Sequence, residues 1–536
     1  MTQSENPHPD SFLARVWPWS AAAGSGVLLT LCFAPWNQGW LCWIALTPLA
    51  AAVFAGGGAW RRLALGYLSG LVFFTTTFWW LGSLAQLYEN SWLRGIPILL
   101  SLYLALFPAF WAWFIGTMLA GRSSQKPFES SLRNLALGAL GASAWVAGEW
   151  VRERLFGGFG WNPLGVALHH DLAMIQIAEL TGTPGLSWLI AFSNLMAVII
   201  VRRIVGELGI GFSKRIRWEF SATMVLIAVV FAFGVRRLLH PEPVKTVPLH
   251  AIAVQPNIPE DVKRDSDAEE RMLEKLQQLT ELALRSQPAP QLVIWPESAV
   301  PPDKSSFDLV MALARQGDFS FLLGMVEGDP IREEEYNAAL LLTNQGASHQ
   351  SYRKIHLVPF GEYLPLRPVL GRFLSELVPG DFTPGREYTV MHMPKPSADL
   401  AVLICFEDTL GDLTRHFVQN GAQVLVNITN DGWFDRTPAA EQHLANAVLR
   451  AVENRRPLVR CGNTGVTCQV YPTGRIEQTL APFHEGFATT DIAVPTAAGL
   501  TFYTQHGDWL SEIAIAVTVL GIGLATVRKK RSSAAA

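Results

Sequence analysis

Residues 20 to 240 hold long apolar runs with few charged side chains, and this feature limits the possible folds more than any other. Half of the 536 residues are hydrophobic and only 16% are charged, which is too apolar for an ordinary water-soluble protein. The core of a bilayer requires about 20 apolar residues per helix. The sequence therefore predicts a polytopic α-helical membrane region of about eight spans. We place them near residues 20–37, 40–56, 62–86, 95–120, 133–152, 184–204, 220–239 and 509–527.

Lysines and arginines gather in alternate loops between these helices, which indicates how the chain crosses the membrane. Short cytoplasmic loops carry the positive excess. The charges are Arg61, Arg62, Arg122, Lys126, Arg202, Arg203, Lys214, Arg215, Arg217, Arg528, Lys529, Lys530 and Arg531. They predict that both termini are cytoplasmic and that the domain at residues 241–505 lies outside. Arg236 and Arg237 break the pattern at the outer end of the seventh helix, and we interpret them as reaching lipid headgroups.

The chain is expected to divide into five parts. They are a cytoplasmic N-terminus (1–19), a membrane domain of seven helices (20–240), a water-soluble domain (241–505), a C-terminal membrane helix (506–528) and a cytoplasmic tail (529–536). In the water-soluble domain, β-branched runs such as "QLVIWPES" and "AQVLVNITND" alternate with helical stretches near residues 267–287 and 438–455. This alternation favours an α/β domain in which helices cover a sheet.

Charge and motif content exclude some classes of function. The net charge of −3 shows no basic excess that would follow a phosphate backbone, so nucleic acid is not an expected partner. His356, His416 and His443 are not spaced as a zinc set, and no nucleotide motif is present, so we expect neither a metal nor another cofactor. Cys461 and Cys468 flank a turn, and only the geometry of that turn decides whether they form a disulfide.

Three predicted strands each end in a group that can take part in catalysis. Glu297 follows "VIWP", Lys354 follows "SYR" and Cys405 follows "AVLI". A thiol becomes a strong nucleophile near a base or a positive charge, and an ammonium can also stabilise an oxyanion. Together, a carboxylate, an ammonium and a thiol are sufficient for acyl transfer.

Each of the three also has an ordinary structural explanation. A lone cysteine at the end of an apolar strand is most often an inert core residue. A glutamate after Trp-Pro is most often part of a turn, and a lysine beside Arg353 most often lies on a solvated face. The case for a site therefore depends on the three occurring together.

The order and surroundings of the three residues resemble the nitrilase, or carbon–nitrogen hydrolase, superfamily, whose triad is Glu, Lys and Cys. The matching segments are "WPES", "YRKIHLVPFGEYLP", "ICFED" and, at residues 427–434, "NITNDGWF". Seven helices before such a domain and one after it resemble the apolipoprotein N-acyltransferase family. The resemblance covers roughly residues 20 to 528 and implies a nitrilase-like αββα sandwich between the membrane segments.

The resemblance also implies roles for individual residues. Glu297 would be the general base, Lys354 the oxyanion-stabilising cation and Cys405 the nucleophile, with Glu362 and Glu407 as further acidic residues of the site. Cys405 would take a fatty acyl group from a phospholipid donor as a thioester, in a ping-pong reaction. The acceptor would be the amine of a diacylglyceryl-modified apolipoprotein. The resemblance places such an enzyme in the inner membrane of a Gram-negative cell, with the catalytic domain facing the periplasm.

Two residues depart from the family pattern. Phe406 stands where a tyrosine often follows the nucleophile, which suggests that the ring matters more than its hydroxyl. Arg264 stands where a tryptophan is frequent, in a loop expected to engage lipid or acceptor.

Three aromatic residues are candidates for substrate binding. Trp161 in "GGFGWNPLG" could line a path for lipid or simply anchor the protein at the interface. Trp433 and Phe434 could cover an acyl chain or simply pack in the core.

Two other functions remain as alternatives. A membrane-tethered amidase of the same fold would use water in place of the amine, but a tether needs only one or two spans. A non-enzymatic receptor or transporter with a degenerate nitrilase-like domain would not need an intact Glu, Lys and Cys set. The predicted membrane helices also lack the charged relay expected of a transporter.

Overall fold

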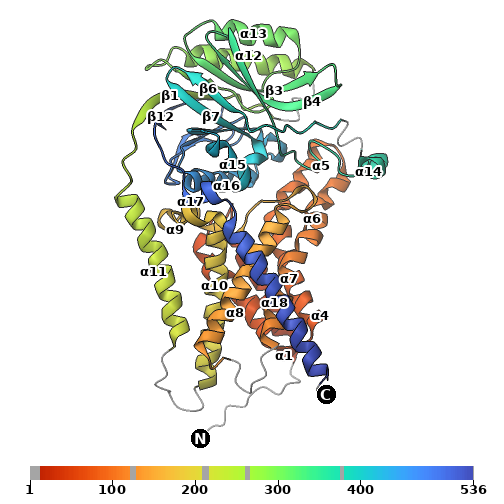
Figure 1. The fold of residues 1–536 in the computed structure, drawn as a ribbon. Helices are drawn as coiled ribbons and strands as arrows, with labels where there is room; N and C mark the ends of the chain where they lie inside the picture. Colours follow the sequence, from red (N-terminus) through yellow and green to blue (C-terminus); the bar gives the residue numbers. More distant parts are fainter. Residues whose placement is uncertain (1–11, 121–127, 208–216, 260–265, 375–379, 535–536) are drawn as a thin grey trace.

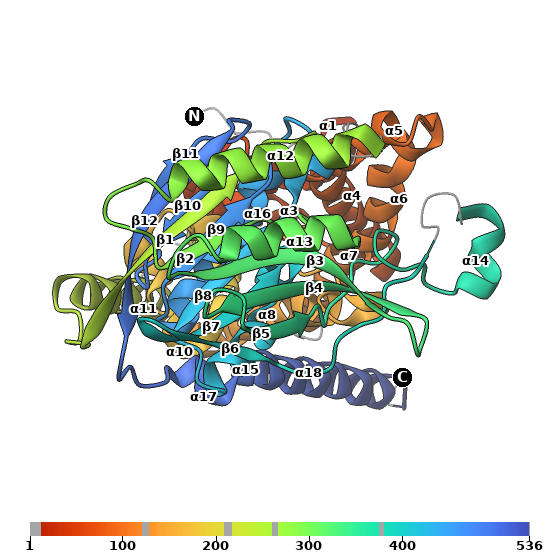
Figure 2. The ribbon, with the colours of Figure 1, turned by 90° about the horizontal axis from the view of Figure 1, so that it is seen from above.

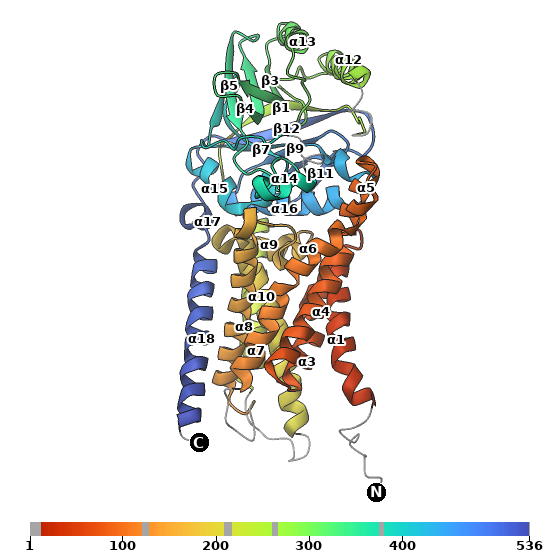
Figure 3. The ribbon, with the colours of Figure 1, turned by 90° about the vertical axis from the view of Figure 1, so that its right-hand side faces the viewer.

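The computed structural model describes residues 12–120, 128–207, 217–259, 266–374 and 380–534. A bundle of helices lies below a two-sheet domain (Figure 1). The bundle helices are α1 (Phe12–Leu31), α2 (Cys42–Ala45), α3 (Thr47–Phe54), α4 (Ala59–Thr77), α5 (Leu84–Leu87), α6 (Ile96–Leu104), α7 (Leu106–Ala120), α8 (Ser131–Arg152), α9 (Leu172–Ile175), α10 (Ala178–Glu207), α11 (Trp218–Leu239) and α18 (Trp509–Ala534). The first residues of α1 and the last residues of α18 lie at the end of the bundle away from the sheets (Figures 1 and 3).

Among the described residues, four helices are long and apolar enough to cross a membrane. They are Ser91–Ala120, Ala178–Gly206, Trp218–Leu239 and Trp509–Val527. A fifth is possible if α4 and the segment Trp79–Leu87, which are bent by 54° relative to each other, form one span. The predicted span near 40–56 is divided between the short helices α2 and α3. The total of eight spans therefore stays a prediction.

The interpretation of Arg237 as reaching lipid headgroups is wrong. Its guanidinium lies 2.6 Å from the carboxylates of both Glu179 and Glu242. Glu179 also accepts a hydrogen bond from Arg455 at the end of a helix of the sheet domain. A buried carboxylate is stabilised by paired guanidinium groups, so Arg237 connects α11 to the rest of the protein. Arg236 is exposed.

Within the described residues, the strands form two six-stranded sheets. The order of the first is β12 (Gly486–Pro495), β1 (Thr246–Gln255), β2 (Leu292–Ile294), β3 (Ser320–Asp329), β4 (Glu334–Thr343) and β5 (Ser348–Arg353). The order of the second is β11 (Ile476–Leu480), β10 (Thr467–Val470), β9 (Leu458–Gly462), β8 (Val424–Thr429), β7 (Ser397–Ile404) and β6 (Val390–Pro394). Each sheet has three parallel central strands flanked by antiparallel ones.

The two sheets are stacked between layers of helices. Helices α12 (Ser266–Ala283) and α13 (Lys304–Ala314) cover the outer face of the first sheet, as Figure 2 shows from above. Helices α15 (Gly411–Gln419) and α16 (Ala439–Asn454) lie between the second sheet and the bundle (Figures 1 and 3). The predicted strands and helices are present, and the layers are those of a nitrilase-like sandwich.

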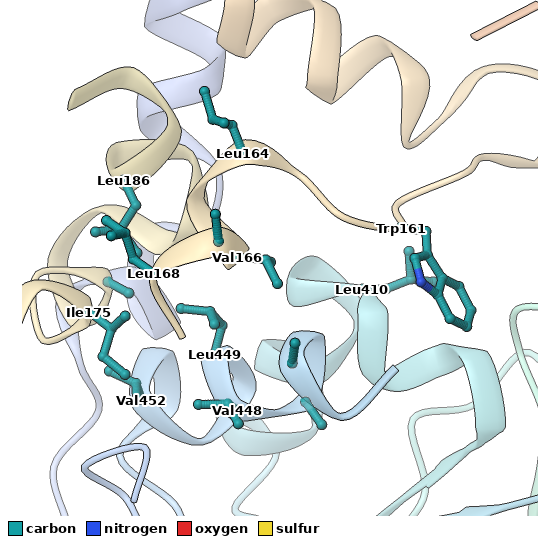
Figure 4. Close-up of a cluster of buried hydrophobic side chains, with 14 of the residues drawn as sticks. Trp161, Leu164, Val166, Leu168, Ile175, Leu186, Leu410, Val448, Leu449 and Val452 are labelled. Carbon is teal, nitrogen blue, oxygen red and sulfur yellow. The ribbon is translucent and has the colours of Figure 1, made fainter. Parts of the chain in front are cut away.

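The second sheet, its helices and the bundle share one continuous hydrophobic core. Figure 4 shows this junction, where Ile175 lies beside Val452 and Trp161 lies beside Leu410. Polar contacts support it, because buried Gln442 of α16 accepts hydrogen bonds from the Trp80 and Asn162 side chains and donates to two backbone carbonyls of the bundle segments. The catalytic candidates are therefore seated directly on the membrane helices.

Candidate active site

Three strand ends converge on one point between the two sheets. Glu297 is the third residue after β2, and Lys354 follows β5 directly, so both come from the first sheet. Cys405 follows β7 of the second sheet. Glu297 and Lys354 are each close enough to the thiol of Cys405 to change its pKa. The structure thus brings together the three residues that the sequence singled out.

Lys354 is 1% exposed and lies between two carboxylates. Its Nζ lies 2.9 Å from Oε1 of Glu362 and 3.6 Å from Oε1 of Glu297. Burial alone would lower the pKa of the lysine, but the charges of Glu362 and Glu297 outweigh it and raise that pKa. Lys354 is therefore a fixed positive charge at neutral pH.

Glu297 is held through both carboxylate oxygens. Asn337 in β4 donates to Oε1 at 2.8 Å and also to Glu362 at 2.7 Å. The backbone N–H of Asn430 donates to Oε2 at 3.0 Å. Glu362 in turn accepts from the backbone N–H of Val358 at 2.8 Å. These contacts fix the direction in which Glu297 presents its remaining lone pairs.

Cys405 begins the short helix η7 (Cys405–Thr409) in a left-handed conformation with φ 52°. Such a conformation is uncommon for a residue other than glycine and indicates a functional constraint. Burial raises the pKa of the thiol well above its ordinary value; Glu297 raises it further, while Lys354 lowers it. The side chain rests as a thiol, so it requires a base before it can act as a nucleophile.

Glu407 ties the ends of two strands together from beneath the site. It is fully buried, and its Oε1 accepts hydrogen bonds from Tyr352 Oη at 2.8 Å and from the N–H groups of Ile355 and His356 at 2.8 and 3.1 Å. Its Oε2 accepts from the Ile404 N–H at 2.9 Å. Burial raises the Glu407 pKa to about 7, although Lys354 and the backbone donors oppose that shift. Glu407 therefore sets the position of Lys354 relative to Cys405.

Aromatic rings form the side of the site that faces the bundle. Phe406 stacks on Trp161 at 5.8 Å between ring centroids and on His356 at 5.7 Å. Trp161 lies 5.4 Å from Trp80, which contacts Phe434 at 4.5 Å. Phe434 therefore packs against the bundle. Trp433 is half-buried in the same short helix, η8 (Asp431–Phe434).

A second group of buried charges lies directly behind Cys405; we call it the rear cluster, Asp408, Asp431, His443 and Arg460. Arg460 donates to Asp408 at 2.7 Å and to Asp431 at 2.9 Å. The two ring nitrogens of His443 lie 2.7 Å from Asp408 and 3.0 Å from Asp431. Nε2 of His443 also lies 3.1 Å from the carbonyl oxygen of Cys405.

Several of these residues were not predicted as part of a site. Asn337, Asn427 and Arg460 stand inside strands that are otherwise apolar, and a buried polar side chain needs a partner. A polar residue within a buried strand was therefore the one feature of the sequence that could have marked these residues as part of a site. His443 was considered only as a metal ligand, and among the described residues no group of three or more His, Cys, Asp or Glu side chains is arranged to hold a metal ion.

Two further predictions concerned Arg264 and a possible disulfide between Cys461 and Cys468. Arg264 lies outside the described residues. Cys461 and Cys468 are buried and free, and the other cysteines in the described part of the chain are free as well. The Cys461 thiol lies 3.4 Å from the carbonyl oxygens of Val254 and Ile294 and so packs between the two sheets.

The fold and the converging Glu, Lys and Cys define a carbon–nitrogen hydrolase domain. The carbon–nitrogen hydrolase family model matches residues 251–500, and the model of the apolipoprotein N-acyltransferase N-terminal domain matches residues 25–196. The chain belongs to the apolipoprotein N-acyltransferase family and is therefore an acyltransferase of the carbon–nitrogen hydrolase superfamily.

Full-length relatives establish this membership. The apolipoprotein N-acyltransferase of Geobacter metallireducens is 33% identical over 521 residues, which cover 94% of each chain. That of Methylococcus capsulatus is 32% identical over 522 residues, covering 96% of this chain and 97% of the relative. Among solved structures, Nit3 of Saccharomyces cerevisiae is 19% identical, with a TM-score of 0.37, over 47% of this chain and 91% of its own.

Proposed function

We propose that this enzyme moves a fatty acyl group from a phospholipid to the N-terminal amine of a diacylglyceryl-modified lipoprotein, through a thioester on Cys405. The observation that carries the proposal is the placement of Cys405 beside Glu297 and Lys354 in a domain seated on membrane helices. Both substrates are anchored in lipid, so the reacting atoms have to meet at the membrane surface.

In the first half-reaction, Glu297 takes the proton of the Cys405 thiol as the sulfur attacks the ester carbonyl carbon of the phospholipid. The carbonyl oxygen becomes an oxyanion, which Lys354 stabilises with its ammonium group. The carbon–oxygen bond of the ester then breaks, and Glu297 returns the proton to the leaving alkoxide. The products are a lysophospholipid and an acyl thioester on Cys405.

In the second half-reaction, the neutral amine of the lipoprotein attacks the thioester carbonyl carbon. Glu297 takes a proton from the attacking nitrogen, and Lys354 again stabilises the oxyanion. The carbon–sulfur bond breaks, an amide forms, and the Cys405 thiolate regains a proton from Glu297. Each half-reaction leaves Glu297 and Lys354 as they began, which a repeating cycle requires.

The aromatic side of the site is proposed to accommodate the acyl chain. Trp161 and Phe434 both contact Trp80 where the site meets the bundle, and Trp433 precedes Phe434 in the same short helix. The indole N–H of Trp161 is buried and has no hydrogen-bond partner among the described residues, so it can donate to a substrate ester oxygen. Phe406 supports Trp161 from below through ring stacking.

We further propose eight spans with both termini in the cytoplasm and the catalytic domain in the periplasm of a Gram-negative cell, in the inner membrane. The shared location of the free ends of α1 and α18, opposite the sheets, supports this arrangement (Figure 3). Exposed tryptophans near helix ends, such as Trp60, Trp79, Trp92 and Trp218, are typical of membrane interfaces. Alkaline phosphatase fusions that are active after residue 202 but inactive near residue 300 would contradict it.

The activity itself is tested with purified protein, a phospholipid carrying a labelled acyl chain, and a synthetic diacylated lipopeptide with a free amine. We expect label to appear on the peptide amine in amide linkage. A matched peptide whose amine is acetylated serves as the control and should stay unlabelled. Release of free fatty acid with no labelled peptide would instead favour the membrane-tethered amidase.

A further inference from the structure

The peptide between Cys405 and Phe406 is held from behind by two buried side chains. The carbonyl oxygen of Cys405 lies 3.1 Å from Nε2 of His443, and Nδ2 of Asn427 donates to it at 3.2 Å. Both side chains are at most 1% exposed. They come from different elements, α16 and β8, so the carbonyl is fixed from two independent directions.

The rear cluster keeps His443 in the form that can donate from both ring nitrogens. Asp408 and Asp431 face the two nitrogens, and Arg460 is the other charged group packed against the ring. Burial alone would lower the His443 pKa, but the two carboxylates outweigh burial and Arg460 and raise it to about 9. The hydrogen bond to the Cys405 carbonyl is therefore charge-assisted at neutral pH.

This contact is made to a residue in an unfavourable backbone conformation. A left-handed φ is unfavourable for a residue with a side chain and persists only where its surroundings enforce it. Cys405 has φ 52°. Because a peptide is planar, fixing the Cys405 carbonyl also fixes the N–H of Phe406, which points the opposite way. The rear cluster thus controls the direction of the thiol and of the adjoining N–H together.

We infer that His443 is a positioning residue for the nucleophile: with Asn427 it locks the Cys405–Phe406 peptide so that the thiol faces Glu297 and Lys354. The inference rests on the proposed role of Cys405 as the nucleophile. His443 exchanges no proton with substrate and does not touch the reacting atoms. Its effect is on the rate at which a bound acyl group reaches the sulfur, and binding of the donor is unaffected.

The test uses full-length purified protein and p-nitrophenyl acetate, a small ester that acylates the thiol and releases p-nitrophenol in a burst. The variants are His443→Gln, which keeps a neutral donor, and Asn427→Ala, which removes the second donor without a change of charge. His416→Gln is the matched control, because His416 is a half-buried histidine on α15 whose Nδ1 contacts the Asp412 carbonyl. Cys405→Ala gives the background.

We expect His443→Gln to lower the maximal burst rate constant by about 10- to 100-fold, because a charge-assisted hydrogen bond is lost. Asn427→Ala should lower it by about 2- to 10-fold, because its hydrogen bond is neutral. The half-saturating ester concentration should stay within about twofold, and the pH profile should keep its midpoints because Glu297 and Lys354 are unchanged. His416→Gln should match the wild-type protein. A purely structural role would instead lower the burst amplitude in step with the folded fraction.

Several results would overturn the inference. They are a wild-type burst rate in folded His443→Gln and Asn427→Ala, a loss that only tracks unfolding, or failure of both variants to fold. The ester burst does not require phospholipid. Wild-type protein that shows the burst but takes no acyl group from phospholipid would therefore contradict the proposed function without contradicting the positioning role of His443.

Discussion

Two buried charge clusters meet at Cys405, and they differ in balance. The front cluster, Glu297, Lys354 and Glu362, has two carboxylates and one ammonium around the thiol. The rear cluster has two carboxylates, one guanidinium and one imidazolium behind the carbonyl of the same residue. The front cluster holds one carboxylate more than it has cations, so it can accept a proton. The rear cluster is neutral when His443 is charged.

This difference in charge balance indicates that the front cluster takes part in the reaction and that the rear cluster holds the structure around Cys405. Removing one member from a balanced buried cluster leaves an uncompensated charge, which lowers the free energy of unfolding. Removing Glu297 or Lys354 acts directly on how the thiol and the oxyanion are stabilised, so activity is expected to fall further than stability does. The comparison therefore predicts the larger activity losses on the front side of Cys405. On the rear side it predicts a loss of stability together with the slower acylation inferred for His443→Gln.

The largest effect is expected in the front cluster. Lys354→Met removes the cation that stabilises the oxyanion, and turnover should fall about 100- to 1000-fold. Glu297→Gln should lose activity on a similar scale because the amide cannot take the thiol proton. Labelled transfer to the lipopeptide measures both. Lys395→Met, at an exposed lysine paired with Asp318, is the control. Near-normal turnover at equal expression would remove the substituted residue from the mechanism.

The rear cluster should make stability depend on pH. A histidine whose pKa is raised in the folded state stabilises the protein fully below the unfolded value near 6.5, and the gain is lost as the pH rises through about 9. The shift corresponds to about 3 kcal/mol. The melting temperature of the wild-type protein in detergent should therefore fall more between pH 6 and 9.5 than the melting temperature of His443→Gln. Parallel curves for the two proteins would contradict a charged His443.

A smaller effect is expected at Glu407, which holds the two strand ends together. The carboxylate accepts four hydrogen bonds, three of them from backbone N–H groups. A glutamine offers one oxygen in place of two and leaves at least one buried N–H without an acceptor. Glu407→Gln should therefore lose about 1–3 kcal/mol of unfolding free energy. An unchanged melting temperature would mean that the strand ends are held by other contacts.

The smallest effect is expected for Phe406→Tyr, a conservative change of the ring after the nucleophile. Phe406 lies between Trp161 and His356, so the ring fills space and a hydroxyl adds little. Phe406→Tyr should change the free energy of unfolding by less than about 1.5 kcal/mol and keep turnover. Phe406→Ala should lose about 3 kcal/mol or more. A large loss in Phe406→Tyr would show that the site excludes a polar atom there.

The sequence predicted the front cluster better than the rear one, and there is a physical reason. Glu297 and Cys405 stand at the ends of apolar runs, and Lys354 lies in the segment "YRKIHLVPFGEYLP", which matches a family motif, so the local sequence marks all three. His443 lies inside the helix predicted near 438–455, and Arg460 lies inside a buried strand that was not predicted. Their partners are distant in the chain, and no local pattern reveals which carboxylate a buried cation will meet. The same limit applies to Glu179, whose pairing with Arg237 corrected the interpretation of that arginine.

The fold shows a similar division. The long helix α12 and the strands with continuous apolar runs, such as β7 and β8, follow from periodicity alone. The short strands β6 and β9 to β11 do not, because four or five residues carry too little pattern. In the bundle, the bend after α4 and the division between α2 and α3 depend on packing against neighbouring helices, which composition does not encode.

The most direct test of the whole account is the mass of the peptide that contains Cys405 after purified protein has been incubated with phospholipid alone. The account predicts a gain of one fatty acyl group on that peptide, removable by neutral hydroxylamine and discharged to the amine of an added diacylated lipopeptide. An adduct on Cys461 or Cys468, or full transfer activity in Cys405→Ala, would contradict it and return Cys405 to the status of a structural thiol.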